Sequence, residues 1–121
     1  MGFDWGEYLK LADELAARTD EAAHRCAISR AYYAALGKAR ELLESEGESF
    51  VSNDNLHAIV WQTLISSPDD RRYYIGIDGR WLRLNRKASD YDSVMADPRE
   101  RAEQAVRKAH AVLTALERVR T

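Results

Sequence analysis

Apolar residues recur at spacings of three and four along almost the whole of this chain. Such spacing places side chains on one face of an α-helix, whereas a half-buried strand alternates at every second residue. Alternating segments are absent, and the only dipeptide typical of a hairpin turn is Asp78-Gly79. The sequence therefore predicts an all-α fold, an up-and-down bundle of four to five helices.

A chain of 121 residues has the size of one domain with one core. We expect a single helical domain over residues 1–121. The expected helices are about Asp4 (N-cap) to Ala17, Thr19 or Asp20 to Glu46-Gly47, Asn53 to Ile65, Gly79 to Tyr91, and Asp97-Pro98 to Arg118. Because Gly76 and Gly79 interrupt the fourth segment, a start near Asp70 with a break at the glycines is the alternative.

The overall charge does not steer this chain to nucleic acid or to anionic lipid, because 18 basic residues face 20 acidic ones and the net charge is −2. Any such binding needs a local patch. The single cysteine, Cys26, has no thiol partner, which fits a reducing cytosol and a packing role. The N-terminus lacks a basic region followed by an apolar run, and no stretch approaches the length of a membrane span. We expect a cytoplasmic protein with no membrane partner.

The second helix carries two unusual faces. At 100° per residue, one face is expected to lie in the core: Ile28, Tyr32, Ala35, Leu36, Ala39, Leu42 and Leu43. The opposite face holds mainly small residues around an arginine and a tyrosine: Ala23, Cys26, Arg30, Tyr33, Ala34 and Gly37. Either another helix of the same chain or a second subunit in a symmetric homodimer covers this face. Arg30 is then partly desolvated and should have an anionic partner.

The fourth helix shows an apolar stripe that we expect to be buried, consisting of Ile77, Trp81, Leu84, Ala88 and Tyr91. Arg83, Arg86 and Asp90 lie about 150° from the centre of this stripe. One interpretation is a solvated face with a weak Arg86–Asp90 ion pair. The other is that the charged residues face the same groove as Arg30, where Asp90 neutralises one arginine and another holds a phosphate.

Three motifs resemble the HEPN superfamily, in particular its small standalone prokaryotic members with "SRAYYA" and "R-x-x-x-DY" helices. They are the run Ala27 to Ala35, which reads AISRAYYAA, then His57 opening an aliphatic stretch, then Arg86 followed by the run Ala88 to Asp92. The resemblance spans almost the whole chain. It implies a helical bundle that usually dimerises. It also implies a small nucleotidyltransferase-like partner in a toxin–antitoxin or defence module.

Many HEPN proteins are metal-independent ribonucleases in which an arginine is followed by a histidine four to six residues later. Here Ser89 stands at the position of that histidine, and the helix contains no histidine at all. Serine does not titrate near neutral pH and cannot shuttle protons as imidazole does. If the protein cleaves RNA, the resemblance leaves Arg86 to stabilise the phosphate and His57 as the acid–base candidate.

The leading hypothesis is a dimer groove that binds RNA or a nucleotide. Its expected lining is Arg30, Tyr33, Arg83, Arg86, Asp90 and Tyr91. The alternative is a non-catalytic interaction module whose arginines and Asp90 form a structural salt-bridge network. His24 and His110 are expected to be structural or exposed. No metal or cofactor is expected, because paired cysteines, glycine-rich phosphate loops and His-Glu-x-x-His are absent from the sequence.

Overall fold

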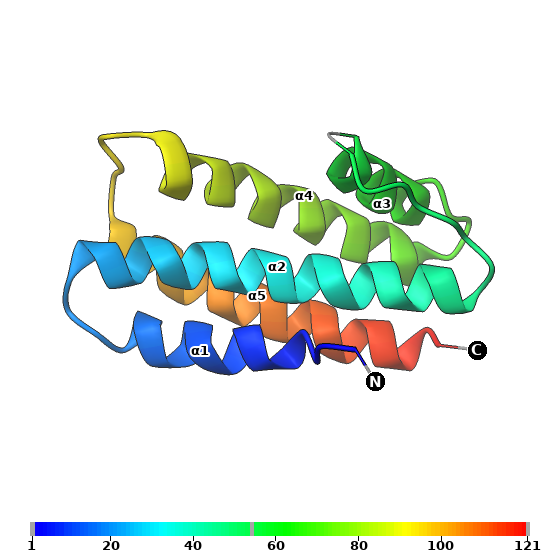
Figure 1. Cartoon of the computed structure of the whole chain (residues 1–121), viewed down its shortest axis with the longest axis horizontal. Helices are drawn as coiled ribbons and strands as arrows, with labels where there is room; N and C mark the ends of the chain where they lie inside the picture. The colour runs from blue at the N-terminus through cyan, green and yellow to red at the C-terminus, as the bar shows by residue number, and fades with distance from the viewer. Residues whose placement is uncertain (1, 54, 121) are drawn as a thin grey trace.

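The computed structural model describes residues 2–53 and 55–120, which form five α-helices and no strand. The helices are α1 (Gly6–Ala16), α2 (Glu21–Ser45), α3 (Leu56–Ile65), α4 (Asp70–Tyr91) and α5 (Pro98–Arg118). α1, α2 and α5 run along the long axis of the molecule, α4 lies over them, and α3 is a short helix at one end of α4 (Figure 1). The predicted all-α bundle is confirmed.

Local capping explains where several helices begin. The side chain of Asp20 accepts a hydrogen bond from the backbone N–H of Ala23 at 3.2 Å, which caps α2. Pro98 occupies the first turn of α5, as predicted. α1 begins at Gly6, two residues after the predicted cap, yet Asp4 Oδ1 still accepts the N–H of Gly6 at 2.9 Å. α3 begins at Leu56, later than the predicted Asn53; Asp54 lies outside the described residues.

α2 is the central helix, since it packs against all four others. Every residue that the helical period assigned to its core face is buried. Tyr32, Ile28 and Leu42 of α2 meet Trp61 and Leu64 of α3 and Leu82 of α4 in the interior, where these are among the largest fully buried side chains. The apolar period of this helix was therefore sufficient to predict its core face.

The opposite face of α2 is covered in part by the same chain. Ala34 and Gly37 are buried, and the Trp5 ring lies so close to Gly37 that an added Cβ would come within 2.2 Å of it. Cys26 is exposed, whereas Arg30 and Tyr33 are half-buried. A glycine at position 37 thus allows the segment before α1 to approach the backbone of α2.

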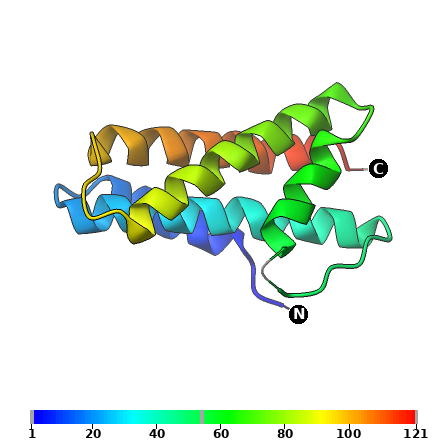
Figure 2. The same ribbon diagram turned by 90° about the horizontal axis from the view of Figure 1, so that it is seen from above.

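α4 is one continuous helix from Asp70, so the alternative start near Asp70 is confirmed, whereas the late start at Gly79 and the break at the glycines are wrong. Gly76 and Gly79 are buried against α3, which crosses beside α4 at one end of the bundle (Figure 2). A Cβ at Gly79 would lie 2.2 Å from the Trp61 ring, and one at Gly76 would lie 2.6 Å from Ile65. The glycines serve close helix–helix approach, and they do not interrupt the helix.

The predicted buried stripe of α4 is wrong at Ile77, Leu84 and Tyr91, whereas its other two residues, Trp81 and Ala88, are half-buried and pack against the core. Leu84 is 68% exposed and Tyr91 is 76% exposed. The packed face holds Ile75, Gly76, Gly79, Leu82, Arg86 and Ser89. Because two glycines, a serine and an arginine give this face little apolar character, the helical period favoured the wrong side.

Within the described residues, no helix is both long enough and apolar enough to cross a membrane.

Candidate nucleotide or nucleic-acid site

A hydrogen-bonded chain of three rings joins α2 to α3. Trp61 Nε1 donates to the hydroxyl of Tyr32 at 3.1 Å, and this hydroxyl lies 2.7 Å from Nδ1 of His57. Since the Tyr32 oxygen already accepts from Trp61, its own proton is free to be donated to Nδ1. This arrangement favours the His57 tautomer that carries its proton on Nε2.

The protonation states of Tyr32 and His57 follow from burial and from nearby cations. Burial raises the pKa of Tyr32 to about 12, although Trp61, Arg83 and Arg86 oppose the shift. The pKa of His57 is lowered from its ordinary value, first by burial and then by Arg86 and Arg83. Near neutral pH the tyrosine is therefore a phenol and the histidine is a neutral imidazole.

Arg86 reaches this chain of rings from the packed face of α4. Its guanidinium carbon lies 5.4 Å from the centre of the Tyr32 ring and 5.5 Å from that of Tyr33. The side chain is 10% exposed and forms one long ion pair, with Asp90 at 3.6 Å. Its Nε is buried and has no hydrogen-bond acceptor among the described residues. A buried guanidinium with an unpaired N–H is costly unless something else accepts that hydrogen bond.

Arg30 lies beside Tyr33 on the same helix, α2. Its guanidinium carbon lies 5.2 Å from the Tyr33 ring centre and 4.6 Å from that of Tyr8 on α1. Its hydrogen bond goes to Ser29 Oγ at 3.2 Å, and no carboxylate pairs with it among the described residues. Among the described residues the expected anionic partner of Arg30 is therefore not found, and aromatic faces contact the cation instead. Arg30 and Arg86 thus share one tyrosine ring.

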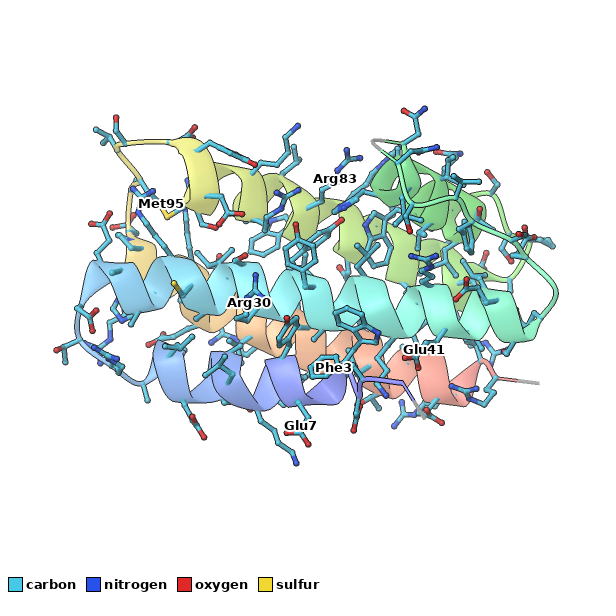
Figure 3. All side chains as sticks on the ribbon, viewed as in Figure 1. Phe3, Glu7, Arg30, Glu41, Arg83 and Met95 are labelled. Carbon is cyan, nitrogen blue, oxygen red and sulfur yellow. The ribbon has the colours of Figure 1, made fainter. Side chains whose placement is uncertain are left out.

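Arg83 lies further along α4, on the side facing α3. Its Nε is buried and lacks an acceptor among the described residues, like that of Arg86. The side chain lines a pocket of about 320 Å³ between α3 and α4, together with Ala58, Ile59, Trp61, Gln62 and Arg80. Arg83 lowers the pKa of His57, which places its charge near the same rings. Figure 3 labels Arg30 on α2 and Arg83 on α4.

These side chains form one group, which we call the arginine–tyrosine cluster: Arg30, Tyr32, Tyr33, His57, Arg83 and Arg86. A second hollow of about 180 Å³ adjoins the cluster through Tyr33 and His57, and its other lining residues are Trp5, Leu36, Gly37, Arg40 and Leu56. Aromatic and aliphatic side chains dominate this hollow. A cationic cluster beside an aromatic hollow suits a ligand with a phosphate and a planar ring.

The remaining residues considered from the sequence do not belong to the arginine–tyrosine cluster. Asp90 is beside Arg86, whereas Tyr91 lies on the outer face of α4 and is 76% exposed. The hydroxyl of Ser89 donates to the carbonyl of Arg86 at 2.8 Å, so it is occupied inside its own helix. His24 is buried with Nε2 2.6 Å from the carbonyl of Arg18, and His110 contacts Asp13 at 3.0 Å on the surface. Both have structural partners.

Sequence reasoning missed the aromatic half of the site. Tyr32 was assigned to the core face and to the family motif but not to the site, and Tyr8 and Trp61 were not named as site residues. Yet Tyr8 contacts Arg30, and Tyr32 contacts Arg86. Tyr32 also lies within hydrogen-bond distance of His57 and accepts from Trp61. The available signal was that Trp61 and Tyr32 need hydrogen-bond partners when buried. Such partners come from other helices, so the spacing along one helix does not reveal them.

Among residues 2–53 and 55–120, no group of three or more histidine, cysteine or acidic side chains is placed to hold a metal ion. What the cluster offers is positive charge, N–H donors and ring faces. Comparison with protein-family models, curated proteins and solved structures finds no match to this chain. The function must therefore be argued from the geometry of the site itself.

Proposed function

We propose that this protein is a HEPN-type component of a prokaryotic toxin–antitoxin or defence module, cytoplasmic and homodimeric, that binds RNA or a nucleotide through the arginine–tyrosine cluster. A small nucleotidyltransferase-like protein is the expected partner. The proposal concerns binding, with the phosphate held by the arginines and a base stacked on the aromatic side chains. RNA proteins commonly use this combination of contacts.

The observation that carries the proposal is the excess of unpaired positive charge. Arg30 and Arg83 have no carboxylate partner among the described residues, and Arg86 has one, at 3.6 Å. The buried Nε atoms of Arg83 and Arg86 have no acceptor there either. The excess positive charge favours an anion with several acceptor oxygens, which makes phosphate the ligand chemistry that fits.

The state of His57 favours binding over cleavage. A general base needs a free lone pair on the nitrogen that faces the substrate. With Nδ1 engaged by Tyr32, the favoured tautomer carries a proton on Nε2, and burial, followed by Arg86 and Arg83, opposes a second proton. His57 is then suited to donate a hydrogen bond to a phosphate oxygen. Ser89 offers no substitute, since its hydroxyl is bonded to the Arg86 carbonyl.

The competing function is a non-catalytic interaction module in which the arginines and Asp90 form a structural network. The Arg86–Asp90 ion pair supports it. However, this pair lies within one helix, at i and i+4, and such pairs contribute only about 0.3–0.5 kcal/mol. It ties no two helices together, so this ion pair stabilises the fold only weakly.

Fluorescence anisotropy with a labelled single-stranded RNA tests the proposal. Arg30→Ala and Arg83→Ala should each weaken binding about fivefold or more and reduce the salt dependence by about one phosphate contact. Arg99→Ala is the matched control, because Arg99 is an exposed arginine of α5 that pairs with Glu103. Wild-type protein that binds neither RNA nor nucleotide, or cluster variants that behave like the control, would overturn the proposal.

Two further readouts separate the ligand classes. Competition by nucleoside monophosphates at concentrations comparable to those of RNA identifies a nucleotide site, whereas displacement by longer RNA alone identifies an extended RNA site. The integrity of the RNA is followed in the same samples. We expect intact RNA; cleavage that is lost in His57→Ala would show that the protein is a ribonuclease and that the assignment of His57 as a donor is wrong.

A further inference from the structure

The small hollow beside the arginine–tyrosine cluster is rich in hydrogen-bond donors. Arg40 and Trp5 line it, and their side chains carry N–H groups and no acceptor. His57 has Nε2–H left for a ligand, because its Nδ1 is engaged by the Tyr32 hydroxyl. Among the described residues of the lining, no side chain is a carboxylate or a carboxamide. A ligand that fills the hollow should therefore present acceptor atoms.

The start of α3 adds backbone donors to the same hollow. Leu56 and His57 are the first residues of this helix, and both line the hollow. The first N–H groups of a helix have no partner within the helix, and they carry a partial positive charge. The side chain of Asn55, at the N-cap, makes no hydrogen bond to them. The helix end and the side chains thus favour the same kind of ligand edge.

The size of the hollow limits what enters it to one ring system. Its volume of about 180 Å³ is below the roughly 300–1,000 Å³ of sites that enclose a drug-sized ligand. Tyr33 lines the hollow, and its ring is also contacted by Arg30 and Arg86. A planar base in the hollow and its phosphate on the arginines would adjoin the same tyrosine.

Arg40 is the side chain of the hollow that can distinguish one base from another. Its Nε pairs with Glu44 of the same helix at 3.3 Å. Its two terminal nitrogens make long hydrogen bonds, to Ser52 Oγ at 3.4 Å and to the Phe50 carbonyl at 3.5 Å. Because bonds of this length are weak, both nitrogens are available to better acceptors.

An arginine fork fits two acceptors that lie side by side, and guanine presents such a pair. Its ring nitrogen N7 and carbonyl oxygen O6 share one edge, and arginine binds them in a bidentate contact. Adenine carries an amino group in place of O6, and cytosine also has an amino group at this edge. These amino donors would face the donors of the hollow, which costs binding free energy.

We propose that the hollow is a guanine subsite in which the base lies against Trp5 and Tyr33, while Arg40 donates to O6 and N7. The inference rests on the proposed function, since it takes a nucleotide or RNA to bind at the cluster and names the base. A free guanine nucleotide and a guanosine within RNA present the same edge, so the experiment includes both.

Calorimetry with nucleoside monophosphates measures the base preference of wild-type protein. Guanosine monophosphate should bind about tenfold or more tightly than adenosine monophosphate, the order expected for one bidentate contact. Inosine monophosphate, which keeps O6 and N7, should bind within about twofold of the guanine nucleotide. The 7-deaza analogue lacks N7 and should bind several-fold more weakly, since the contact is no longer bidentate.

The same comparison is made by anisotropy with two single-stranded RNAs that differ in one position, guanosine or adenosine. A preference among the free nucleotides supports a nucleotide subsite. A preference that appears with RNA alone supports a subsite for a guanosine of RNA.

Arg40→Met and Arg40→Lys should each remove the preference for guanine and change the affinity for the adenine ligand little. Lysine keeps the charge beside Glu44 but lacks the planar fork, so it separates bidentate recognition from simple attraction. Arg99→Met is the matched control, because Arg99 also pairs with a glutamate four residues later and should retain the preference. Thermal unfolding checks that the variants are folded.

The results that contradict the inference differ from those that contradict the proposed function. Equal affinity for guanine and adenine, with both nucleotides and both RNAs, would refute the guanine subsite and leave the binding function in place. A preference that persists in both Arg40 variants would refute it too, since another group would then recognise the base. Protein that binds none of these ligands would refute the two proposals together.

Discussion

The Tyr32 hydroxyl and Nδ1 of His57 lie 2.7 Å apart, and this hydrogen bond joins the core of the bundle to its candidate site. Tyr32 is fully buried, whereas His57 is half-buried at the start of α3. The tyrosine therefore sets the tautomer of a histidine that faces the ligand side. A change in the protonation of His57 is in turn felt by the packing of α2 against α3.

This relationship predicts a pH dependence of stability. The pKa of His57 is lowered in the folded state, mainly by burial and then by the two arginines. Below its ordinary value of 6.5 the unfolded chain therefore takes up a proton before the folded chain does. The stabilisation is present above that pH and is lost as the pH falls through the lowered folded-state pKa.

Urea unfolding of wild-type protein and His57→Gln at several pH values between neutrality and moderate acidity measures this effect. The wild-type free energy of unfolding should fall more steeply with acid than that of the variant, since His24 and His110 are common to both proteins. Equal slopes, or an imidazole pKa by NMR at or above the ordinary value, would contradict the assignment. Addition of a bound phosphate ligand should raise the pKa of His57.

Asp90→Asn separates the two proposed functions. The substitution removes the acidic partner of Arg86 but costs only a few tenths of a kcal/mol of stability, because the pair is long and Asp90 is one-third exposed. A phosphate-binding cluster should then bind RNA more tightly, roughly twofold to tenfold, since a nearby negative charge is gone.

The control for Asp90→Asn is Asp78→Asn, which removes another acid of α4 that pairs with Lys108 and not with the cluster. Anisotropy titrations and thermal unfolding are recorded for both variants. If Asp90→Asn lowers the stability of the dimer and leaves RNA affinity unchanged, the structural network is the better account of these residues.

Gly79→Ala should destabilise the protein although alanine is the better helix former. Intrinsic propensity alone would give a gain of about 1 kcal/mol. However, the new Cβ would lie 2.2 Å from the Trp61 ring, and relieving that overlap should cost about 1–3 kcal/mol in addition to the lost gain. Lys87→Ala, at an exposed position of the same helix, should change stability little.

The ring displaced by Gly79→Ala is also the one that donates to Tyr32. A double variant, Gly79→Ala with Trp61→Leu, should be less destabilised than the two single changes would give together, because the smaller side chain removes the overlap. Urea unfolding of all four proteins completes the cycle. Additive effects would mean that Gly79 is not required for the approach of α3.

The sequence predicted the all-α bundle and the core face of α2 because both depend on apolar period within single helices. It failed in part for α4, where the apolar period is equally clear but Leu84 and Tyr91 are exposed, although Trp81 packs against the core. Hydrophobic spacing shows that a face is suited to packing, and it does not show which partner covers it. Gly76 and Gly79 looked like interruptions of the helix, because the close approach of α3 that requires glycine cannot be read from the sequence of α4 alone.

The candidate site was predictable in part. Arg30, Arg83, Arg86 and His57 were named from motif and position, and the structure brings them around Tyr32 and Tyr33. Tyr91 was named with them, yet it lies on another face of α4 because five residues correspond to about 140° of further rotation from Arg86. Tyr8 contacts Arg30 across two helices, and no pattern along the chain reports such a contact.

Arg25 of α2 contacts the C-terminal end of α4, and this contact predicts a loss of stability when Arg25 is replaced. Its guanidinium donates to the carbonyls of Ser89, Asp92 and Ser93, where the helix ends and its last carbonyls lack partners in the helix. Arg25→Met keeps most of the aliphatic stem but removes these charged donors. We expect a loss of about 1.5–3 kcal/mol, the usual range for hydrogen bonds to charged groups.

Hydrogen exchange should locate the effect of Arg25→Met. Amides in the last turn of α4 should exchange faster, whereas those in the middle of α2 should change only by the global loss of stability. Arg18→Met is the control, because Arg18 is 64% exposed and pairs with Asp20 in the turn before α2. A loss no larger than that of the control, or exchange that accelerates uniformly, would show that Arg25 does not cap α4. Since Asp90 lies in this turn beside Arg86, fraying confined to it should also increase the affinity of the cluster for RNA, in the same direction as Asp90→Asn.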